Sequence, residues 1–160
     1  MRGAIIAGIV VLILIIGGIL GYTYFTMGNV KIYVVDAPSG LVITLTSTSI
    51  MLHKVTGGWV TVSNKTISFN LTSAAVLLVK AVIPAGKYNE MFIYVSNGSA
   101  SILGLSVSLP SHVFKIHFVN NQDLVVGGMY NATVIINFPH ISMNAGNLII
   151  TPSVTAVAYN

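Results

Sequence analysis

The chain has 160 residues, of which 54% are hydrophobic and only 6% charged, whereas an ordinary soluble domain carries about 25% charged residues. Seven Lys and Arg residues against three acids give a formal net charge of +4. The bases are scattered, so the high pI reflects scarce acids and does not indicate a nucleic-acid partner. The chain has no cysteine, which excludes disulfides, thiolate metal sites and cysteine nucleophiles.

The first thirty residues predict a membrane helix. No charge occurs between Arg2 and Lys31, residues 4–21 are almost purely aliphatic and small, and an aromatic cluster follows at 22–25. About 20 apolar residues cross a bilayer as a helix, and aromatic residues favour the interface. We therefore predict one transmembrane helix from Ala4 to about Thr26, within an N-terminal anchor that comprises residues 1–28.

The orientation of this anchor follows from its single flanking charge. Arg2 favours a cytoplasmic N-terminus. The chain is then expected to cross the cell membrane once, with its C-terminal domain outside the cell. Two alternatives remain open, a cleaved secretory signal and a pilin-like leader cut just after Gly3. Gly17, Gly18 and Gly21 lie on one broad helix face, and small residues at such spacing permit close helix packing in lipid. Glycine is also simply common in membrane helices.

Residues 29–160 predict an extracytoplasmic all-β domain. Short β-rich runs alternate with Gly, Asn and Pro turn signals at intervals of 8–12 residues, which is typical of an antiparallel β-sandwich with immunoglobulin-like or Greek-key connections. Ala74–Ile83 is the only helix-like segment, and Asn97-Gly98 predicts a hairpin turn. The predicted strands are 30–35, 41–55, 59–62, 67–71, 91–95, 102–109, 113–119, 130–138 and 148–159, with a turn at 36–40.

Four Asn-x-Ser/Thr sequons occur in this part of the chain, at Asn64, Asn70, Asn97 and Asn131. Ser, Thr and Asn supply much of the polar surface that charged residues normally would. Because the sequons fall near predicted turns and strand ends, we expect exposed sites that a glycosylating cell would modify.

The order of several short motifs resembles a known family. These are Asp36-Ala37-Pro38, His53, Gly57-Gly58-Trp59-Val60, Pro84-Ala85-Gly86-Lys87-Tyr88 and Leu148-Ile149-Ile150-Thr151-Pro152. The chain is similar to an uncharacterised family of secreted or membrane-anchored archaeal and bacterial domains, known only as a domain of unknown function. The resemblance covers about Val30–Ala158 and implies an extracytoplasmic β-sandwich with no known catalytic residues.

The residues that could carry chemistry are few. His112 and His117 point to opposite faces of one strand if it is continuous, because Phe114, Ile116 and Phe118 alternate inward and leave Lys115 outward. The other histidines, His53 and His140, have no partner nearby in sequence. Asp36 is explained by its own turn, Asp123 lies in a predicted loop and Glu90 stands at a predicted strand start. We therefore expect no metal, no cofactor and no enzymatic activity.

Two further residue types are interpreted as core. Trp59 follows a Gly-Gly turn and is expected to be buried between sheets, although an exposed ligand platform remains the alternative. Met51, Met91, Met129 and Met143 are expected to fill the core. The sequence thus favours a non-enzymatic, membrane-anchored cell-surface protein with a structural or interaction role. The alternatives are a pilin-like or strand-donating filament subunit and an accessory subunit of a membrane complex. The expected partners of the protein are membrane lipid and, through the glycine face, a partner helix or a second copy of the chain.

Overall fold

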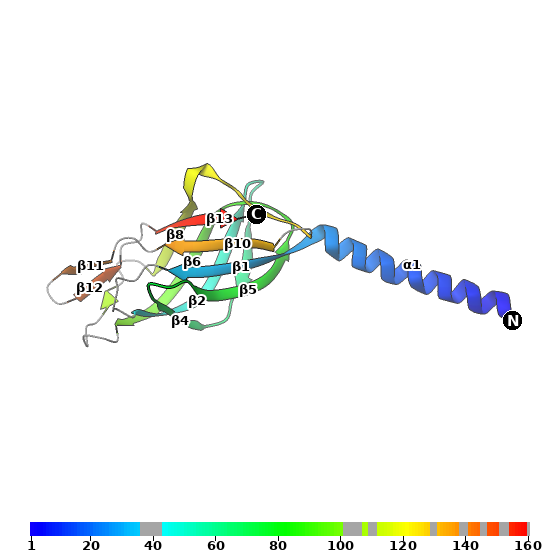
Figure 1. Ribbon diagram of the computed structural model, residues 1–160, viewed down its shortest axis with the longest axis horizontal. Coiled ribbons are helices and arrows are strands. Elements are labelled where there is room, and N and C mark those ends of the chain that lie inside the picture. The colour runs from blue at the N-terminus through cyan, green and yellow to red at the C-terminus, as the bar shows by residue number, and fades with distance from the viewer. Residues whose placement is uncertain are drawn as a thin grey trace.

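The computed structural model consists of one protruding helix and a β-domain (Figure 1). It describes residues 1–35, 43–100, 107–108, 112–128, 131–137, 141–144, 147–150 and 154–159. Helix α1 (Arg2–Thr26) confirms the predicted apolar helix and buries none of its residues against the domain along its most apolar window. It is long and apolar enough to cross a membrane or to serve as a signal sequence. Strand β1 begins at Met27, so no linker separates helix and domain.

The remaining elements are almost all strands. A single short 3-10 helix, η1 (Val119–Asn121), stands among the described elements of the domain. The strands are β1 (Met27–Val35), β2 (Ile43–Lys54), β3 (Trp59–Ser63), β4 (Ile67–Leu71), β5 (Val76–Pro84), β6 (Gly86–Ala100), β7 (Val107–Ser108), β8 (Val113–Phe118), β9 (Leu124–Val126), β10 (Asn131–Asn137), β11 (Ile141–Asn144), β12 (Asn147–Ile150) and β13 (Val154–Tyr159).

Ten strands form one main sheet, in which eight follow the order β3-β2-β6-β8-β13-β10-β1-β5 and the other two, β4 and β9, pair with β2 and β6. The long strands β2 and β6 each pair with two short strands on one side, β2 with β3 and β4, and β6 with β8 and β9. Because β3 and β4 also contact β5, the two ends of the sheet approach each other and the domain is barrel-like or sandwich-like. Strands β7, β11 and β12 form a small second sheet far from the helix (Figure 1).

The prediction of an all-β domain after an N-terminal helix is confirmed, but the prediction of antiparallel pairing is wrong for two strand pairs of the main sheet. Strand β1 pairs parallel to β10, and β13 pairs parallel to β8. Parallel neighbours cannot be joined by a tight hairpin, and in both pairs the connection runs through other strands. Immunoglobulin-like or Greek-key connectivity stays a prediction.

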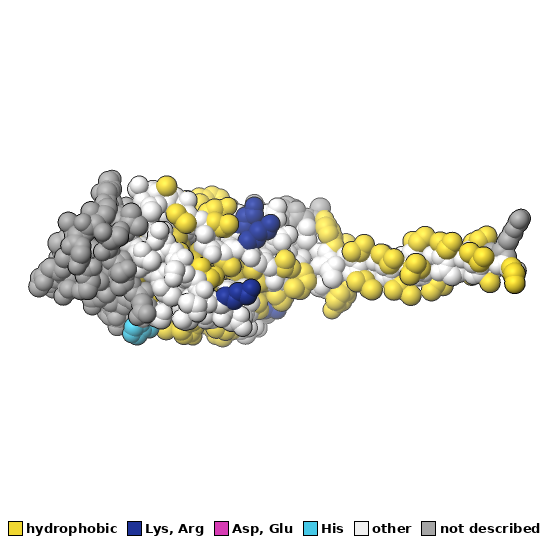
Figure 2. Space-filling view, turned by 90° about the horizontal axis from the view of Figure 1, so that it is seen from below, with side chains coloured by type: hydrophobic (Ala, Val, Ile, Leu, Met, Phe, Trp, Pro, Cys, Tyr) yellow, Lys and Arg dark blue, Asp and Glu magenta, His cyan; other side chains and the backbone are white. Residues whose placement is uncertain are grey.

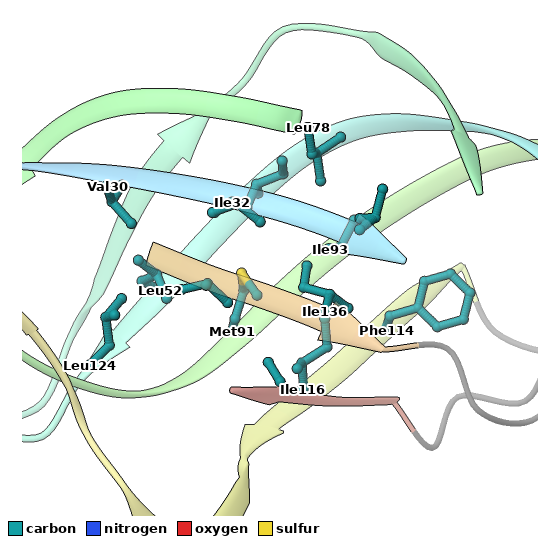
Figure 3. Close-up of a cluster of buried hydrophobic side chains, with 14 of the residues drawn as sticks. Val30, Ile32, Leu52, Leu78, Met91, Ile93, Phe114, Ile116, Leu124 and Ile136 are labelled. Carbon is teal, nitrogen blue, oxygen red and sulfur yellow. The ribbon is translucent and has the colours of Figure 1, made fainter. Parts of the chain in front are cut away.

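The core lies between the inward faces of the sheet, and strict alternation places it there. In β1, Val30, Ile32 and Val34 are fully buried while their neighbours are not, and β8 buries Phe114 and Ile116 in the same way. Figure 3 shows Val30, Ile32, Phe114 and Ile116 in one cluster with side chains from β2, β5, β6, β9 and β10. The predicted inward and outward residues of β8 are therefore confirmed.

Two local predictions are wrong because strand pairing decides the structure. The segment 74–83 was expected to be helical, yet β5 pairs antiparallel with β1 along nearly its whole length. Its β-branched residues suit this strand, since two branched atoms at Cβ fit the pleated surface well. Asn97-Gly98 does not form a hairpin turn, because β6 continues through it and pairs with β2.

The C-terminal region is divided more finely than predicted. Residues 148–159 were expected to form one strand, but they contribute to β12 and β13, which belong to different sheets. Strand β9 follows directly after the predicted loop at Asp123. The predicted turn at 36–40, most of the predicted strand 102–109, Met129 and His140 lie outside the described residues.

Candidate functional site

A cluster of aromatic side chains covers the outer face of β3, β2 and β6. The cross-strand register places His53 beside Trp59 on one side and beside Glu90 on the other. The Trp59 ring lies 4.8 Å from the His53 ring and 4.3 Å from the Phe92 ring, measured between centroids. Tyr94 continues the row at 6.5 Å from Phe92. We call His53, Trp59, Phe92 and Tyr94 the aromatic platform.

The expectation that Trp59 is a core residue is wrong, because its side chain is 40% exposed. Val60 and Val62 pack against the core from the same strand. Since successive side chains of a strand point to opposite faces, Trp59 and Thr61 must point outward. Met51 pairs with Thr61 and lies on this outer face rather than in the core, whereas Met91 is fully buried as predicted.

Charged residues border the platform on its β8 side. The Lys115 Nζ atom lies 2.9 Å from Glu90 Oε1 and 5.7 Å from the centre of the Phe92 ring. His117 Nε2 lies 3.5 Å from the same carboxylate oxygen. Only 15% of the Glu90 side chain is exposed, so the ion pair holds a largely buried carboxylate in place. The sequence placed Glu90 at a strand start, but it lies inside β6 between His53 and His117.

A shallow cavity of about 330 Å³ opens beside this ion pair. It brings together two of the three acids, Glu90 and Asp123, which the sequence had left apart. The lining residues are Asn89, Glu90, His117, Phe118, Asn121, Gln122 and Asp123. Within the described ranges, no three metal-ligating side chains converge closely enough to hold an ion.

The histidines make separate contacts. His53 Nδ1 lies 3.1 Å from the Asn89 side-chain oxygen, which fixes the ring beside Trp59. His112 Nδ1 lies 3.0 Å from the Val95 carbonyl oxygen. These bonds orient two imidazoles at the surface, and they connect β2 and the start of β8 to β6.

A second cavity, of about 630 Å³, lies where the helix meets the domain. We call this region the junction cavity. Its lining residues are Leu20, Thr23, Tyr24, Met27, Gly28, Asn29, Val82 and Gly128. The Ala85 amide donates a 2.8 Å hydrogen bond to the Thr26 carbonyl oxygen at the end of α1. A Cβ atom at Gly128 would overlap the Tyr24 carbonyl oxygen, so only glycine permits this close approach.

The predicted modification and helix-packing residues occupy open positions. The side chains of Asn64, Asn70 and Asn131 are exposed, and Asn70 accepts a 2.9 Å hydrogen bond from Thr44 Oγ1. Asn97 lies in β6, and its side chain is outside the described part. A Cβ atom added at Gly17, Gly18 or Gly21 would meet nothing within 4 Å. Glycosylation and helix packing at these residues stay predictions.

A family model described as a domain of unknown function, DUF4382, matches residues 27–152. The chain belongs to the DUF4382 family. The matched region of this DUF4382 protein begins at the first residue of β1 and includes the aromatic platform. No match is found among curated proteins or among solved structures.

Proposed function

We propose that this DUF4382 protein is a non-enzymatic cell-surface protein whose membrane-anchored domain makes interactions through the aromatic platform. Exposed Trp59, whose ring contacts the tilted rings of His53 and Phe92, carries this proposal. Large aromatic side chains gathered on a surface are typical of interaction sites, and tryptophan is among the residues that dominate binding energy. These two ring contacts also fix the orientation of the Trp59 ring, which lowers the conformational entropy lost when a partner binds.

The cavity beside the platform is compatible with a role in binding. Its described lining contains no hydroxyl or thiol nucleophile. Glu90, one of the two carboxylates in the lining, already pairs with Lys115 and so has a structural contact. An interaction surface needs no nucleophile.

Photo-crosslinking tests the interaction directly. A photoreactive amino acid replaces Thr61, which is exposed next to Trp59 on β3, and native cells expressing the full chain are irradiated. We expect a discrete adduct that disappears when Trp59→Ala is added. The matched control places the same group at Leu77, which is 49% exposed on β5. Equal adducts at both positions, or an adduct at Thr61 that survives Trp59→Ala, would contradict the proposal.

Membrane anchoring and orientation are tested separately. We propose that α1 is retained with its N-terminus in the cytoplasm and that the domain faces the exterior, as Arg2 favours. The full-length chain should resist alkaline carbonate extraction, and protease added to intact cells should reach the domain. Release by carbonate, or protection of the domain, would refute this placement. A mature N-terminus at Ala4 would instead indicate pilin-like processing.

We also propose that cells able to glycosylate asparagine modify some of the four sequons. Exposure of Asn64, Asn70 and Asn131 supports this. Each occupied site should raise the intact mass above the 16.9 kDa of the polypeptide. A native protein at the unmodified mass would rule it out.

A subunit of a membrane complex or filament is the second candidate, and the open glycine face favours it. Small residues let helix backbones approach closely in lipid. Gly17→Ile with Gly21→Ile should therefore abolish association in a membrane dimerisation reporter. Gly8→Ile is the matched control, since at 100° per residue Gly8 lies half a turn from Gly17. Loss of association in both variants, or in neither, would leave the glycine face without a role.

A further inference from the structure

The junction cavity lies where the bilayer surface must fall if α1 spans the membrane, as the proposed function requires. A hydrocarbon core is about 30 Å thick and takes about 20 helical residues. Counting from Ala4 places its outer boundary at about Thr23, which lines the cavity. The cavity is therefore open to lipid on its helix side and to the headgroup region on its domain side.

The walls of the cavity suit an acyl chain. Leu20 and Val82 are 63% and 61% exposed, and Tyr24 is 46% exposed. Exposed apolar groups of this size are costly in water and favourable in hydrocarbon. On the face drawn in Figure 2, hydrophobic side chains continue from the helix onto the adjoining part of the domain.

Two lysines stand next to the cavity on the same outer face. Asn29 pairs with Val82 at the cavity, and the next outward pair along the strands is Lys31 opposite Lys80, about 7 Å further on. Like charges directly opposite each other destabilise a sheet. Neither lysine makes an ion pair within the described residues, where both ion pairs involve Glu90. The coloured residues of Figure 2 include Lys or Arg and no visible acid.

We propose that the junction cavity, together with Lys31 and Lys80, binds an anionic membrane lipid. One acyl chain lies in the cavity along α1, and the lipid phosphate faces the two ammonium groups. A phosphate between them converts a repulsive pair into two attractive contacts, since each lysine is a compact charge that suits phosphate. Lysine stems also pack on apolar surface while their charged ends reach the headgroups. The occupant is a lipid rather than a protein because the cavity is continuous with the membrane helix.

Native mass spectrometry of the full-length chain in non-ionic detergent tests this proposal. Dioleoyl phosphatidylglycerol and dioleoyl phosphatidylcholine are titrated separately. We expect tighter binding of phosphatidylglycerol, and a loss of about fivefold in that preference for each of Lys31→Gln and Lys80→Gln, the change expected for one lysine near an anionic surface. Lys65→Gln is the control, since Lys65 is exposed in the turn between β3 and β4. Val82→Glu, at an exposed position, should also remove the preference.

Three results would overturn the proposal. Equal affinity for the two lipids would show that the lysines do not recognise phosphate. Equal effects of the Lys31, Lys80 and Lys65 variants would place the binding elsewhere. Displacement of the lipid by excess inorganic phosphate would show that the cavity holds no acyl chain. Carbonate extraction separates these outcomes from the proposed function, because a retained chain without lipid preference refutes only the lipid site, and a released chain refutes both.

Discussion

The aromatic platform and the junction cavity both expose apolar side chains, but they do so in different ways. At the platform, the Trp59 ring packs against the rings of His53 and Phe92, and the adjacent Lys115 pairs with Glu90. At the junction, Val82 is largely exposed, and Lys31 and Lys80 face each other with neither of them paired to an acid of the described residues. The platform is organised by its own ring contacts, whereas our proposal has the junction completed only by a membrane.

The largest effect tests whether the platform is separate from the core. Phe114 is fully buried, so Phe114→Ala should destabilise the domain by about 3–5 kcal/mol. Trp59→Ala should cost only about 1–3 kcal/mol, since it removes two exposed ring contacts worth about 0.5–1.5 kcal/mol each. Urea unfolding of the full chain in detergent, followed by circular dichroism, measures both. Equal losses would make Trp59 a core residue after all.

A medium effect tests the packing at the junction. Gly128→Ala should destabilise the chain by about 1–3 kcal/mol, the usual cost of overpacking, because its Cβ atom meets the Tyr24 backbone. Gly127→Ala is a matched control one residue away, where a Cβ atom has nothing within 4 Å. Thermal unfolding and protease cleavage near Thr26 report the difference. If both variants behave alike, the helix is not held by this contact.

The smallest effect concerns Tyr88, a buried residue that links the platform strand β6 to the junction. Its hydroxyl donates a 2.6 Å hydrogen bond to the Pro84 carbonyl oxygen, and burial raises its pKa above the usual value. At a pH just above about 10, the Tyr88 hydroxyl therefore ionises only in the unfolded chain. The free energy of unfolding falls as the pH rises past that value.

Tyr88→Phe should cost about 1 kcal/mol at neutral pH through the lost hydrogen bond. It should also flatten the fall in unfolding free energy between neutral and strongly alkaline pH. Tyr94→Phe, on the outer face of the same strand, is the control. A variant that loses stability with pH as steeply as the wild type would show that Tyr88 does not titrate in this range.

The sequence predicts most of the strands but little of the sites. Alternation in β8 is visible in Phe114-Lys115-Ile116, and the apolar helix is visible from its length. The segment 74–83 fits helical and strand spacing equally, and only its pairing with β1 decides. The contact of His53 with Trp59 spans only a short Gly-Gly turn. It could have been predicted from the sequence, because Val60 and Val62 mark the inward face of the strand and so place Trp59 on the outer face.

The remaining contacts depend on register between strands that are distant in sequence. Glu90 meets Lys115 only because β6 and β8 pair with that alignment. Likewise Lys31 faces Lys80, and Gly128 approaches Tyr24, across many intervening residues. Composition and periodicity carry no information about such alignments, so the ion pair beside the platform and the junction cavity could not be found before the fold.

The direct passage from α1 into β1 sets the reach of the domain. A flexible linker would let the platform sample a wide volume above the membrane. Here the hydrogen bond from Ala85 to Thr26 and the close packing of Gly128 on Tyr24 hold the domain at one distance from the end of α1 and in one orientation relative to it. If α1 spans a membrane as proposed, a partner on the same membrane would meet the platform at a high effective concentration when its own binding surface lies at the height of the platform, and hardly at all otherwise.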